Sequence, residues 1–130
     1  MANRGIIRRV EEDTTVRPAT LKDAEAIFTL VDQHREELVP RSLGSIVESI
    51  DRFVVADCGG ETAGCAAYQI HPEIGDAEAA TVEIVSLAVA EEFRRRGIGR
   101  RLVEAVVAAV ARFNPREVLE IGRASCRERV

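Results

Sequence analysis

Apolar residues in the first half of the chain recur with two different periods. Polar and apolar positions alternate through Thr14–Pro18, which predicts a short strand. Helical spacing follows, and a helix is expected from a cap at Thr20, with an acidic residue three positions on, to about Leu38. The apolar positions of this helix are Ala24, Ile27, Leu30 and Val31. After Pro40, Ser42 is expected to cap a shorter helix. That helix would carry Leu43, Ile46, Val47 and Ile50.

The middle of the chain has the pattern of three strands. Residues 52–56 and 61–70 lie on either side of Gly59-Gly60, a pair that is typical of a β-hairpin turn. A loop through His71-Pro72 and Gly75 is expected to follow. It leads to residues 81–89, an apolar run that is typical of a central strand.

One more helix and the start of a strand complete the pattern. The helix is predicted from about Gly99 to Arg112, and Asn114-Pro115 stops it. Its apolar stripe is Leu102, Val103, Val106, Val107 and Val110. A fifth strand begins near Val118. The predicted order is therefore β-α-α-β-β-β-α-β, an α/β domain with no internal repeat and no linker.

Composition narrows the class of protein. A chain of 130 residues with 46% apolar and 4% aromatic residues has the size of one domain with an aliphatic core. No apolar run approaches the length that a bilayer requires, so no membrane span or membrane partner is expected. The three cysteines, Cys58, Cys65 and Cys126, have the spacing of neither a disulfide framework nor a zinc site, and no metal is implied.

The balance of charged residues and the first residues of the chain bear on its binding partners and its location in the cell. Lys and Arg number 18 against 22 Asp and Glu, which argues against a general nucleic-acid binder. No apolar secretory segment follows the first ten residues, so a cytoplasmic location is expected.

Both ends of the chain depart from the domain pattern. Residues 1–13 are polar and unpatterned, and we expect a mobile arm there. Residues 121–130 (IGRASCRERV) resemble, codon for codon, the in-frame translation of a common sequencing adapter. On that interpretation the native domain covers residues 14–120 and is cut off after the start of its fifth strand. Cys126 would then have no part in the chemistry of the protein. An ordinary basic C-terminal tail is the alternative.

The junction before the last helix concentrates positive charge. Residues 94–101 contain five arginines and two glycines, at a helix N-terminus where acidic residues are the favourable ones. Exposed N–H groups, nearby guanidiniums and glycines that admit close approach together predict a site for a phosphate or pyrophosphate. The spacing is neither GxGxxG, since Leu102 stands at the third glycine position, nor a P-loop. A solvated arginine-rich turn is the bland alternative, and binding of nucleic-acid phosphate is the weakest one.

These residues resemble a known family. Leu87-Ala88-Val89, a four-residue turn, then Arg94-x-x-Gly97-x-Gly99 and an amphipathic helix resemble the acetyl-CoA motif of the GNAT N-acetyltransferase superfamily. The element order is similar to that fold over residues 14–120, which implies a mixed central sheet with flanking helices. Residues 38–42 (LVPRS), 53–56 (FVVA) and 82–84 (VEI) resemble the short acetylglutamate-synthase-like branch.

The resemblance implies acetyl-CoA as the acetyl donor. Backbone amides from Arg95 to Arg100 would hold the pyrophosphate, and the strand edge at 87–89 would pair with the pantetheine arm. The cofactor-binding residues implied in this way are Leu87, Ala88, Val89, Arg94, Arg95, Arg96, Gly97, Ile98, Gly99 and Arg100. Backbone N–H groups near Leu87 would stabilise the oxyanion.

The resemblance also implies two functional side chains. Glu83 matches the family's carboxylate, a base that acts directly or through water, with a solvent-facing strand glutamate as the alternative. Arg41 matches the arginine that faces the substrate's carboxylate, with a surface arginine as the alternative. Val85 departs from the branch, many of whose members carry arginine there. His34 and His71 are interpreted as surface residues, and Cys58 and Cys65 as small strand residues without a basic partner.

The function implied is direct transfer of acetyl to the amine of a glutamate-like amino acid or another small amine. Two alternatives stay open: a truncated, non-catalytic CoA-binding fragment with an exposed sheet edge, and acetylation of a protein amine. The family fold continues after its fifth strand with a helix and two strands, and that helix commonly supplies a tyrosine that protonates the thiolate; Tyr68 does not match this position. A homodimer is left open.

Overall fold

The computed structural model of the chain describes residues 13–121 and 127–129, and its strands form one sheet. The strands are β1 (Thr14–Pro18), β2 (Phe53–Cys58), β3 (Glu61–Glu73), β4 (Asp76–Val89), β5 (Glu117–Ile121) and β6 (Arg127–Arg129). They lie in the order β1-β2-β3-β4-β5-β6. Neighbours are antiparallel except for β4 and β5, which are parallel. The sheet is therefore mixed, as expected.

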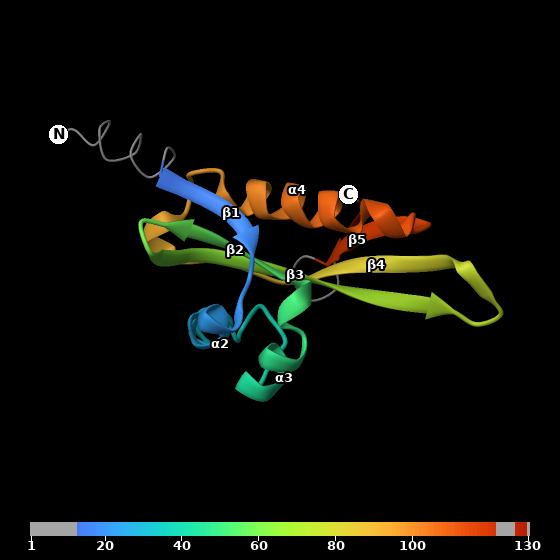
Figure 1. Cartoon of the computed structure of the whole chain (residues 1–130), viewed down its shortest axis with the longest axis horizontal. Coiled ribbons are helices and arrows are strands. Elements are labelled where there is room, and N and C mark those ends of the chain that lie inside the picture. Colours follow the sequence, from blue (N-terminus) through green and yellow to red (C-terminus); the bar gives the residue numbers. More distant parts are fainter. Residues whose placement is uncertain (1–12, 122–126, 130) are drawn as a thin grey trace.

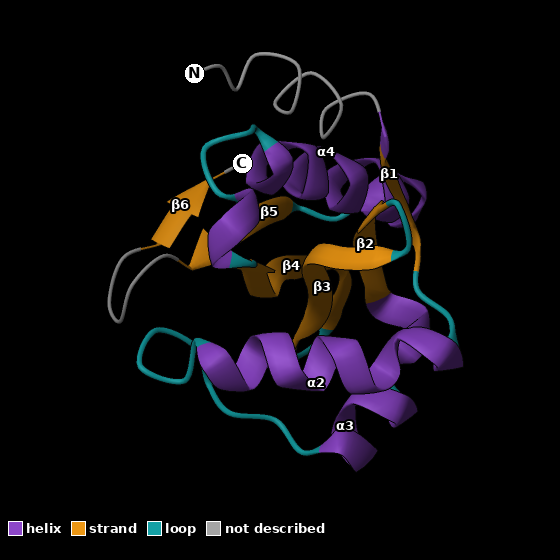
Figure 2. Ribbon diagram, turned by 90° about the vertical axis from the view of Figure 1, so that its left-hand side faces the viewer, coloured by secondary structure: helices purple, strands orange, loops and turns teal. Residues whose placement is uncertain are grey.

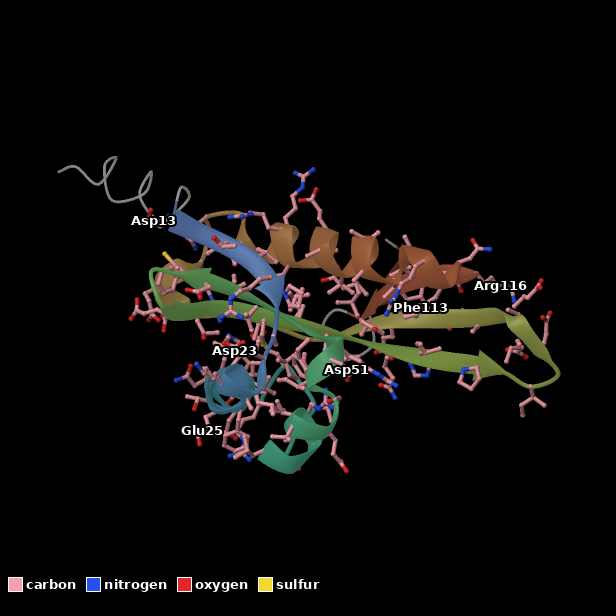
Figure 3. All side chains as sticks on the ribbon, in the orientation of Figure 1. Asp13, Asp23, Glu25, Asp51, Phe113 and Arg116 are labelled. Carbon is pink, nitrogen blue, oxygen red and sulfur yellow. The ribbon has the colours of Figure 1, made fainter. Side chains whose placement is uncertain are left out.

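Helices cover both faces of this sheet. The helices are α2 (Ala24–Gln33), α3 (Leu43–Glu48) and α4 (Ile98–Val110). In Figures 1 and 2, α4 lies on one face and α2 and α3 lie on the other. Side chains follow the same division, with Asp51 on the α3 side and Phe113 on the α4 side (Figure 3). The predicted α/β architecture with flanking helices is confirmed.

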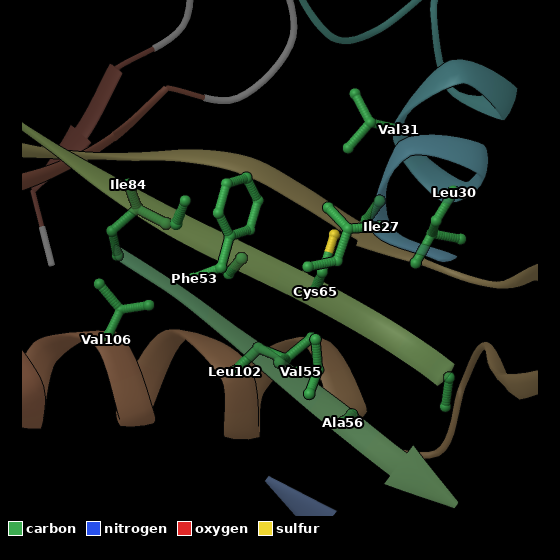
Figure 4. Packing of buried hydrophobic residues seen from close by; sticks show 14 of the residues in the cluster. Ile27, Leu30, Val31, Phe53, Val55, Ala56, Cys65, Ile84, Leu102 and Val106 are labelled. Carbon is green, nitrogen blue, oxygen red and sulfur yellow. The ribbon is translucent and has the colours of Figure 1, made fainter. Parts of the chain in front are cut away.

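The core forms where both helical layers meet the sheet (Figure 4). The four apolar positions predicted for the first helix are all at most 4% exposed. Leu102, Val106 and Val110 of α4 are fully buried against the other face. Phe53 and Val55 of β2 lie between the layers. Burying each such side chain contributes about 1.5–3 kcal/mol to the stability of the fold. The buried positions are those that the helical and strand periodicities predict.

The first predicted helix is shorter than expected. Helix α2 ends at Gln33, not near Leu38, and residues 34–37 form a turn. The six residues from Asp32 to Glu37 are all polar, so a continued helix would have no face to bury. Helix α3, which begins at the Ser42 cap, is also brief: Ser42 Oγ accepts from the Ser45 N–H at 3.1 Å.

The prediction of a loop through His71-Pro72 and Gly75 is wrong for His71 and Pro72, which lie in β3, and only Ile74 and Gly75 form a turn. Strand β3 continues to Glu73 and β4 starts at Asp76, so a long hairpin projects beyond the helices (Figure 1). Its turn contains Gly75 at φ +84°. Pairing with β2 stops at Ala67, so the rest of β3 is an edge on that side among the described residues. A proline is tolerated on such an edge, and Pro72 does not end the strand.

Helix α4 and strand β5 follow the prediction closely, whereas strand β6 was not predicted. Helix α4 starts at Ile98, one residue early, and Asn114 ends the segment in the left-handed conformation at φ +50°. Strand β5 pairs in parallel with β4, and β6 pairs with β5. This pairing does not bear on the adapter-like origin of residues 121–130, which stays a prediction. Residues 1–12 of the expected arm, residues 122–126 with Cys126, and residue 130 lie outside the described residues.

None of the described helices combines the length and the apolar character that a bilayer span requires.

Candidate active site

A cleft of about 760 Å³ opens beside the middle of β4. Its walls come from the segment before α3, from α3 and the turn after it, from β3 and β4, and from one residue of β5. The lining includes Arg41, Ser45, Ser49, Arg52, Glu83 and Leu87. Two residues that the sequence assigns to substrate chemistry, Arg41 and Glu83, therefore share one cavity although 42 positions of the numbering separate them.

Glu83 lies on β4 with its side chain 15% exposed. Its neighbours Val82 and Ile84 are buried toward α4, and strand alternation turns Glu83 to the opposite face. Oε1 lies 2.7 Å from His71 Nε2. Among the described residues no hydrogen bond is made to Oε2. The carboxylate is thus half-buried and oriented through one oxygen.

Arg41 is held in place by neutral partners. Its guanidinium donates to Ser45 Oγ at 3.0 and 3.3 Å and to Ser49 Oγ at 2.8 Å. Its Cζ lies 5.3 Å from the centre of the Phe53 ring. Burial, and next the charge of Arg52, lower the pKa of Arg41, which nevertheless stays protonated at neutral pH. It makes no ion pair within the described chain, so a partly buried cation faces the cleft without a carboxylate in contact with it.

A bulge interrupts β4 next to this cleft. Between the pairs Cys65↔Ala88 and Ala67↔Val85, β4 has one residue more than β3, and Ser86 adopts φ +54°. Pairing with β5 covers only residues 81–84 of β4. Beyond them, no strand of the described chain pairs with the β5-facing edge of residues 85–89. An extended ligand can add to such an edge by main-chain hydrogen bonds.

The arginine-rich turn follows directly. Arg95 and Gly97 have φ of +63° and +76°, and Gly97 precedes the first turn of α4. The N–H groups of Ile98, Gly99 and Arg100 come before the first intrahelical bond, from the Arg101 N–H to Gly97 O at 3.2 Å. A Cβ added to Gly99 would lie 3.7 Å from Val89 Cγ2, so the helix start adjoins the end of β4. Its N–H groups and dipole favour an anion.

Arginines surround this helix start, and three of them make local contacts. Arg94 Nη2 donates to His34 Nε2 at 2.8 Å, and His34 Nδ1 lies 2.8 Å from Leu30 O. Because arginine only donates and a carbonyl only accepts, these two contacts fit the tautomer that carries a proton on Nδ1. Arg96 bonds to the carbonyl of Arg95, and Arg101 bonds to that of Thr14. None of these guanidiniums pairs with a carboxylate in the described part of the chain.

The cleft is lined by three of the predicted site residues, Arg41, Glu83 and Leu87. The other predicted residues follow it in the chain, from the end of β4 to the start of α4: Ala88, Val89 and residues 94–100. His71 is exposed, as predicted, whereas His34 is half-buried. Sequence reasoning missed that His71 contacts Glu83. It also missed Ser45 and Ser49 beneath Arg41, and the bulge at Ser86. The i+4 and i+8 spacing after Arg41 was the one available signal for the serines.

The two described cysteines, Cys58 and Cys65, do not line this cleft. Cys65 is fully buried, its Sγ lies 3.4 Å from the Ser86 carbonyl oxygen, and burial raises the pKa of its thiol to about 12. A thiol in that state is not a nucleophile at neutral pH. Among the described residues, no group of three or more His, Cys, Asp or Glu side chains is arranged to hold a metal ion.

Sequence similarity to acetyltransferases extends over most of the chain. The model of the Acetyltransferase (GNAT) family matches residues 18–127. The protein named Uncharacterized N-acetyltransferase CT2212, from Chlorobaculum tepidum, is 41% identical over 108 residues, which are 82% of this chain and 66% of that protein. Mycothiol acetyltransferase of Saccharopolyspora erythraea is 43% identical over 61 residues, 47% of this chain and 19% of that protein. This chain thus spans at most 66% of the length of these relatives.

Solved structures share the fold. Rv2747 of Mycobacterium tuberculosis, in complex with CoA and NLQ, aligns with a TM-score of 0.72 and 27% identity over 83% of this chain and 64% of its own. N-acetylglutamate synthase of Neisseria gonorrhoeae, complexed with coenzyme A and N-acetyl-glutamate, aligns with a TM-score of 0.73 over 84% of this chain and 25% of its own. At 22% identity, the second likeness shows the fold alone.

Proposed function

Because this chain belongs to the GNAT acetyltransferase family, we propose that it binds acetyl-CoA and transfers the acetyl group to the amine of a small molecule. The observation that carries the proposal is a continuous path through the molecule. The path begins at the first turn of α4, follows the unpaired edge of β4, and ends in the cleft with Glu83 and Arg41. A long ligand with an anionic end and a reactive end matches this path.

The anionic end would lie against α4. The N–H groups of Ile98, Gly99 and Arg100 supply donors for pyrophosphate oxygens, and the guanidiniums of Arg94, Arg95, Arg96 and Arg100 supply positive charge. Gly97 has open space where a side chain would stand, since an added Cβ meets no atom within 4 Å. The backbone can therefore approach a phosphate closely.

The arm that joins the two ends would run along β4. Amide groups of the arm can take the hydrogen bonds that β5 leaves unused at Leu87, Ala88 and Val89. The bulge at Ser86 ends the regular pairing at the point where the arm would meet the cleft.

The reactive end would lie beside Glu83. Acetyl-CoA supplies a thioester, whose carbonyl carbon is the group that an amine attacks. An ammonium has no lone pair, so Glu83 would accept a proton from it, directly or through one water molecule. Backbone N–H groups near Leu87 would stabilise the negative charge that develops on the carbonyl oxygen. The C–S bond then breaks, the amide forms, and the CoA thiolate leaves and takes up the proton that the attacking nitrogen gives up.

For the acceptor we propose a glutamate-like amino acid. Arg41 lies in the same cleft as Glu83 and has no carboxylate partner in the described chain, and a guanidinium suits a carboxylate. The hydroxyls of Ser45 and Ser49 fix its position before a substrate arrives. An amino acid could then place its carboxylate at Arg41 and its amine near Glu83.

The test is an acetyl-transfer assay on the whole chain. Release of the CoA thiol is followed with acetyl-CoA and a panel of glutamate, other amino acids, polyamines and a peptide with a free N-terminus. Glu83→Gln should lower kcat by about 10²–10⁴-fold. Glu78→Gln, an exposed residue on the same strand, is the matched control and should leave kcat unchanged.

The panel separates the alternatives. Transfer only to the peptide would favour acetylation of a protein amine. Binding of acetyl-CoA with no transfer to any amine would favour a CoA-binding chain without catalysis, and would overturn the catalytic assignment of Glu83.

A further inference from the structure

The imidazole of His71 contacts the carboxylate that the cleft presents. His71 Nε2 lies 2.7 Å from Glu83 Oε1, and the two side chains are 46% and 15% exposed. An ionised carboxylate only accepts hydrogen bonds, so Nε2 must carry the proton in this contact. Glu83 lines the cleft and His71 does not. The histidine therefore contacts the carboxylate from outside the set of residues that line the cleft.

Strand pairing explains how the two residues meet. Gln69 lies opposite Glu83, and His71 lies opposite Thr81, so His71 and Glu83 form a diagonal pair across β3 and β4. Long side chains reach across such diagonals. The contact exists because β3 continues past Ile70; a loop at His71-Pro72 would not place this imidazole over β4.

Within the described residues, His71 is the one hydrogen-bond partner of the Glu83 carboxylate. Charged and titratable groups that line the same cleft are Glu37, Arg41, Arg52, Tyr68 and Glu120, and on β3 the charged neighbour of His71 is Glu73. None of these donates a hydrogen bond to Glu83. Without His71, the carboxylate could rotate among its rotamers at the cleft wall.

We propose that His71 is a positioning residue: it holds Oε1 of Glu83 so that Oε2 is presented to the attacking amine. This inference rests on the proposed function, because it assigns His71 a role only through Glu83. Displacements of about 1 Å in such a group can cost up to about 10²-fold in rate. Loss of the contact should therefore lower kcat and leave the binding of both substrates intact.

Kinetic measurements on position 71 test this role. His71→Ala should lower kcat about tenfold, with the KM values for amine and acetyl-CoA within about twofold of the wild type. His71→Gln keeps an N–H donor and should recover most of the lost kcat. Glu73→Ala changes an exposed residue two positions further along β3 that does not line the cleft; it is the control and should behave as the wild type. In a Glu83→Gln background, His71→Ala should lower kcat no further.

A measurement without turnover separates this inference from the proposed function. The chain has two histidines, so His34→Gln assigns both imidazole spectra in a ¹⁵N-labelled sample. Glu83→Gln should change the Nε2 chemical shift of His71 and leave that of His34 unchanged. An unchanged His71 signal, or a normal kcat in an active His71→Ala protein, would overturn the positioning role alone. A wild-type chain that acetylates no amine would overturn the proposed function and this role with it, even where the contact is seen.

Discussion

The carboxylate of Asp23 accepts two hydrogen bonds from the guanidinium of Arg17, from Nη1 at 2.9 Å and from Nη2 at 3.0 Å. Asp23 is 7% exposed, and its Oδ2 also accepts from the Thr20 N–H at 2.7 Å. Arg17 in turn reaches Asp57 on β2 at 3.2 Å. One carboxylate thus joins the end of β1 to the start of the first helix, and so helps to fix the helical layer that carries the cleft.

Removing the charge of Asp23 should destabilise the fold and change its response to acid. Asp23→Asn should cost about 1–2 kcal/mol at pH 7, less than for a fully buried pair because Arg17 is 35% exposed. The hydrogen bonds from Arg17, more than any other contact, hold the pKa of Asp23 below its usual range. The stability it contributes is therefore complete above the unfolded pKa, near 4, and is lost as pH falls through the lower folded pKa.

Urea unfolding between pH 7 and pH 2.5 measures both effects. The difference in unfolding free energy between wild type and Asp23→Asn should shrink as the pH falls below about 4. Asp57→Asn is the comparison, and its smaller effect is expected because Asp57 is 31% exposed. A difference that stays constant over the whole range would argue against a depressed pKa.

Gly64 allows β3, β4 and α4 to approach one another closely, at the segment of β4 whose β5-facing edge is unpaired among the described strands. An added Cβ would lie 2.9 Å from the Ala88 carbonyl oxygen and 2.9 Å from Leu102 Cδ1. Gly64→Ala should therefore destabilise the chain by about 1–3 kcal/mol. It should also weaken acetyl-CoA binding, since the strain acts on the backbone of Ala88.

A glycine of α3 provides the control for Gly64. At Gly44 the nearest atom to an added Cβ is Ser42 Oγ at 3.9 Å, so Gly44→Ala should be neutral or slightly stabilising in the helix. Thermal unfolding and acetyl-CoA titration of both variants give the comparison. Equal melting temperatures for the two variants would show that β3, β4 and α4 are less tightly packed than the two 2.9 Å distances at Gly64 indicate.

Arg41 is expected to act on the carboxylate of the acceptor and not on the donor. Arg41→Met should raise the KM for a glutamate-like acceptor about 10- to 100-fold, because one charge-assisted contact is lost. The affinity for acetyl-CoA should be unchanged. Arg112→Met is the matched control, because Arg112 also stacks on an aromatic ring, Phe113, at 4.7 Å but lies outside the cleft. Equal effects on amines with and without a carboxylate would refute the assignment.

Periodicity and turn chemistry predicted the parts of this molecule that depend on one segment at a time. The buried face of α2 follows from the spacing of its apolar residues, and the β2–β3 turn follows from Gly59-Gly60. The arginine-rich turn was likewise visible as a cluster at a helix start.

Features that depend on two segments were missed. The bulge at Ser86 and the pairing of His71 with Glu83 exist only in the register between β3 and β4, and serine at a positive φ leaves no mark in the sequence. Pro72 indicated a loop because proline is excluded from the middle of a sheet. It is tolerated on an edge, and whether a strand is an edge is a property of the whole sheet that one segment does not show.

Acetyl-CoA titration by calorimetry tests whether the first turn of α4 holds the anionic end of acetyl-CoA, with two glycine variants compared against the wild type. Gly97 and Gly75 have similar positive φ, +76° and +84°, and open space around each, so glutamate strains both backbones alike. Only Gly97→Glu places a carboxylate beside the first turn of α4. We expect saturable binding by the wild type and by Gly75→Glu, and an affinity lower by about 30-fold or more in Gly97→Glu. Undiminished binding by Gly97→Glu, or no saturable binding by the wild type, would contradict this expectation.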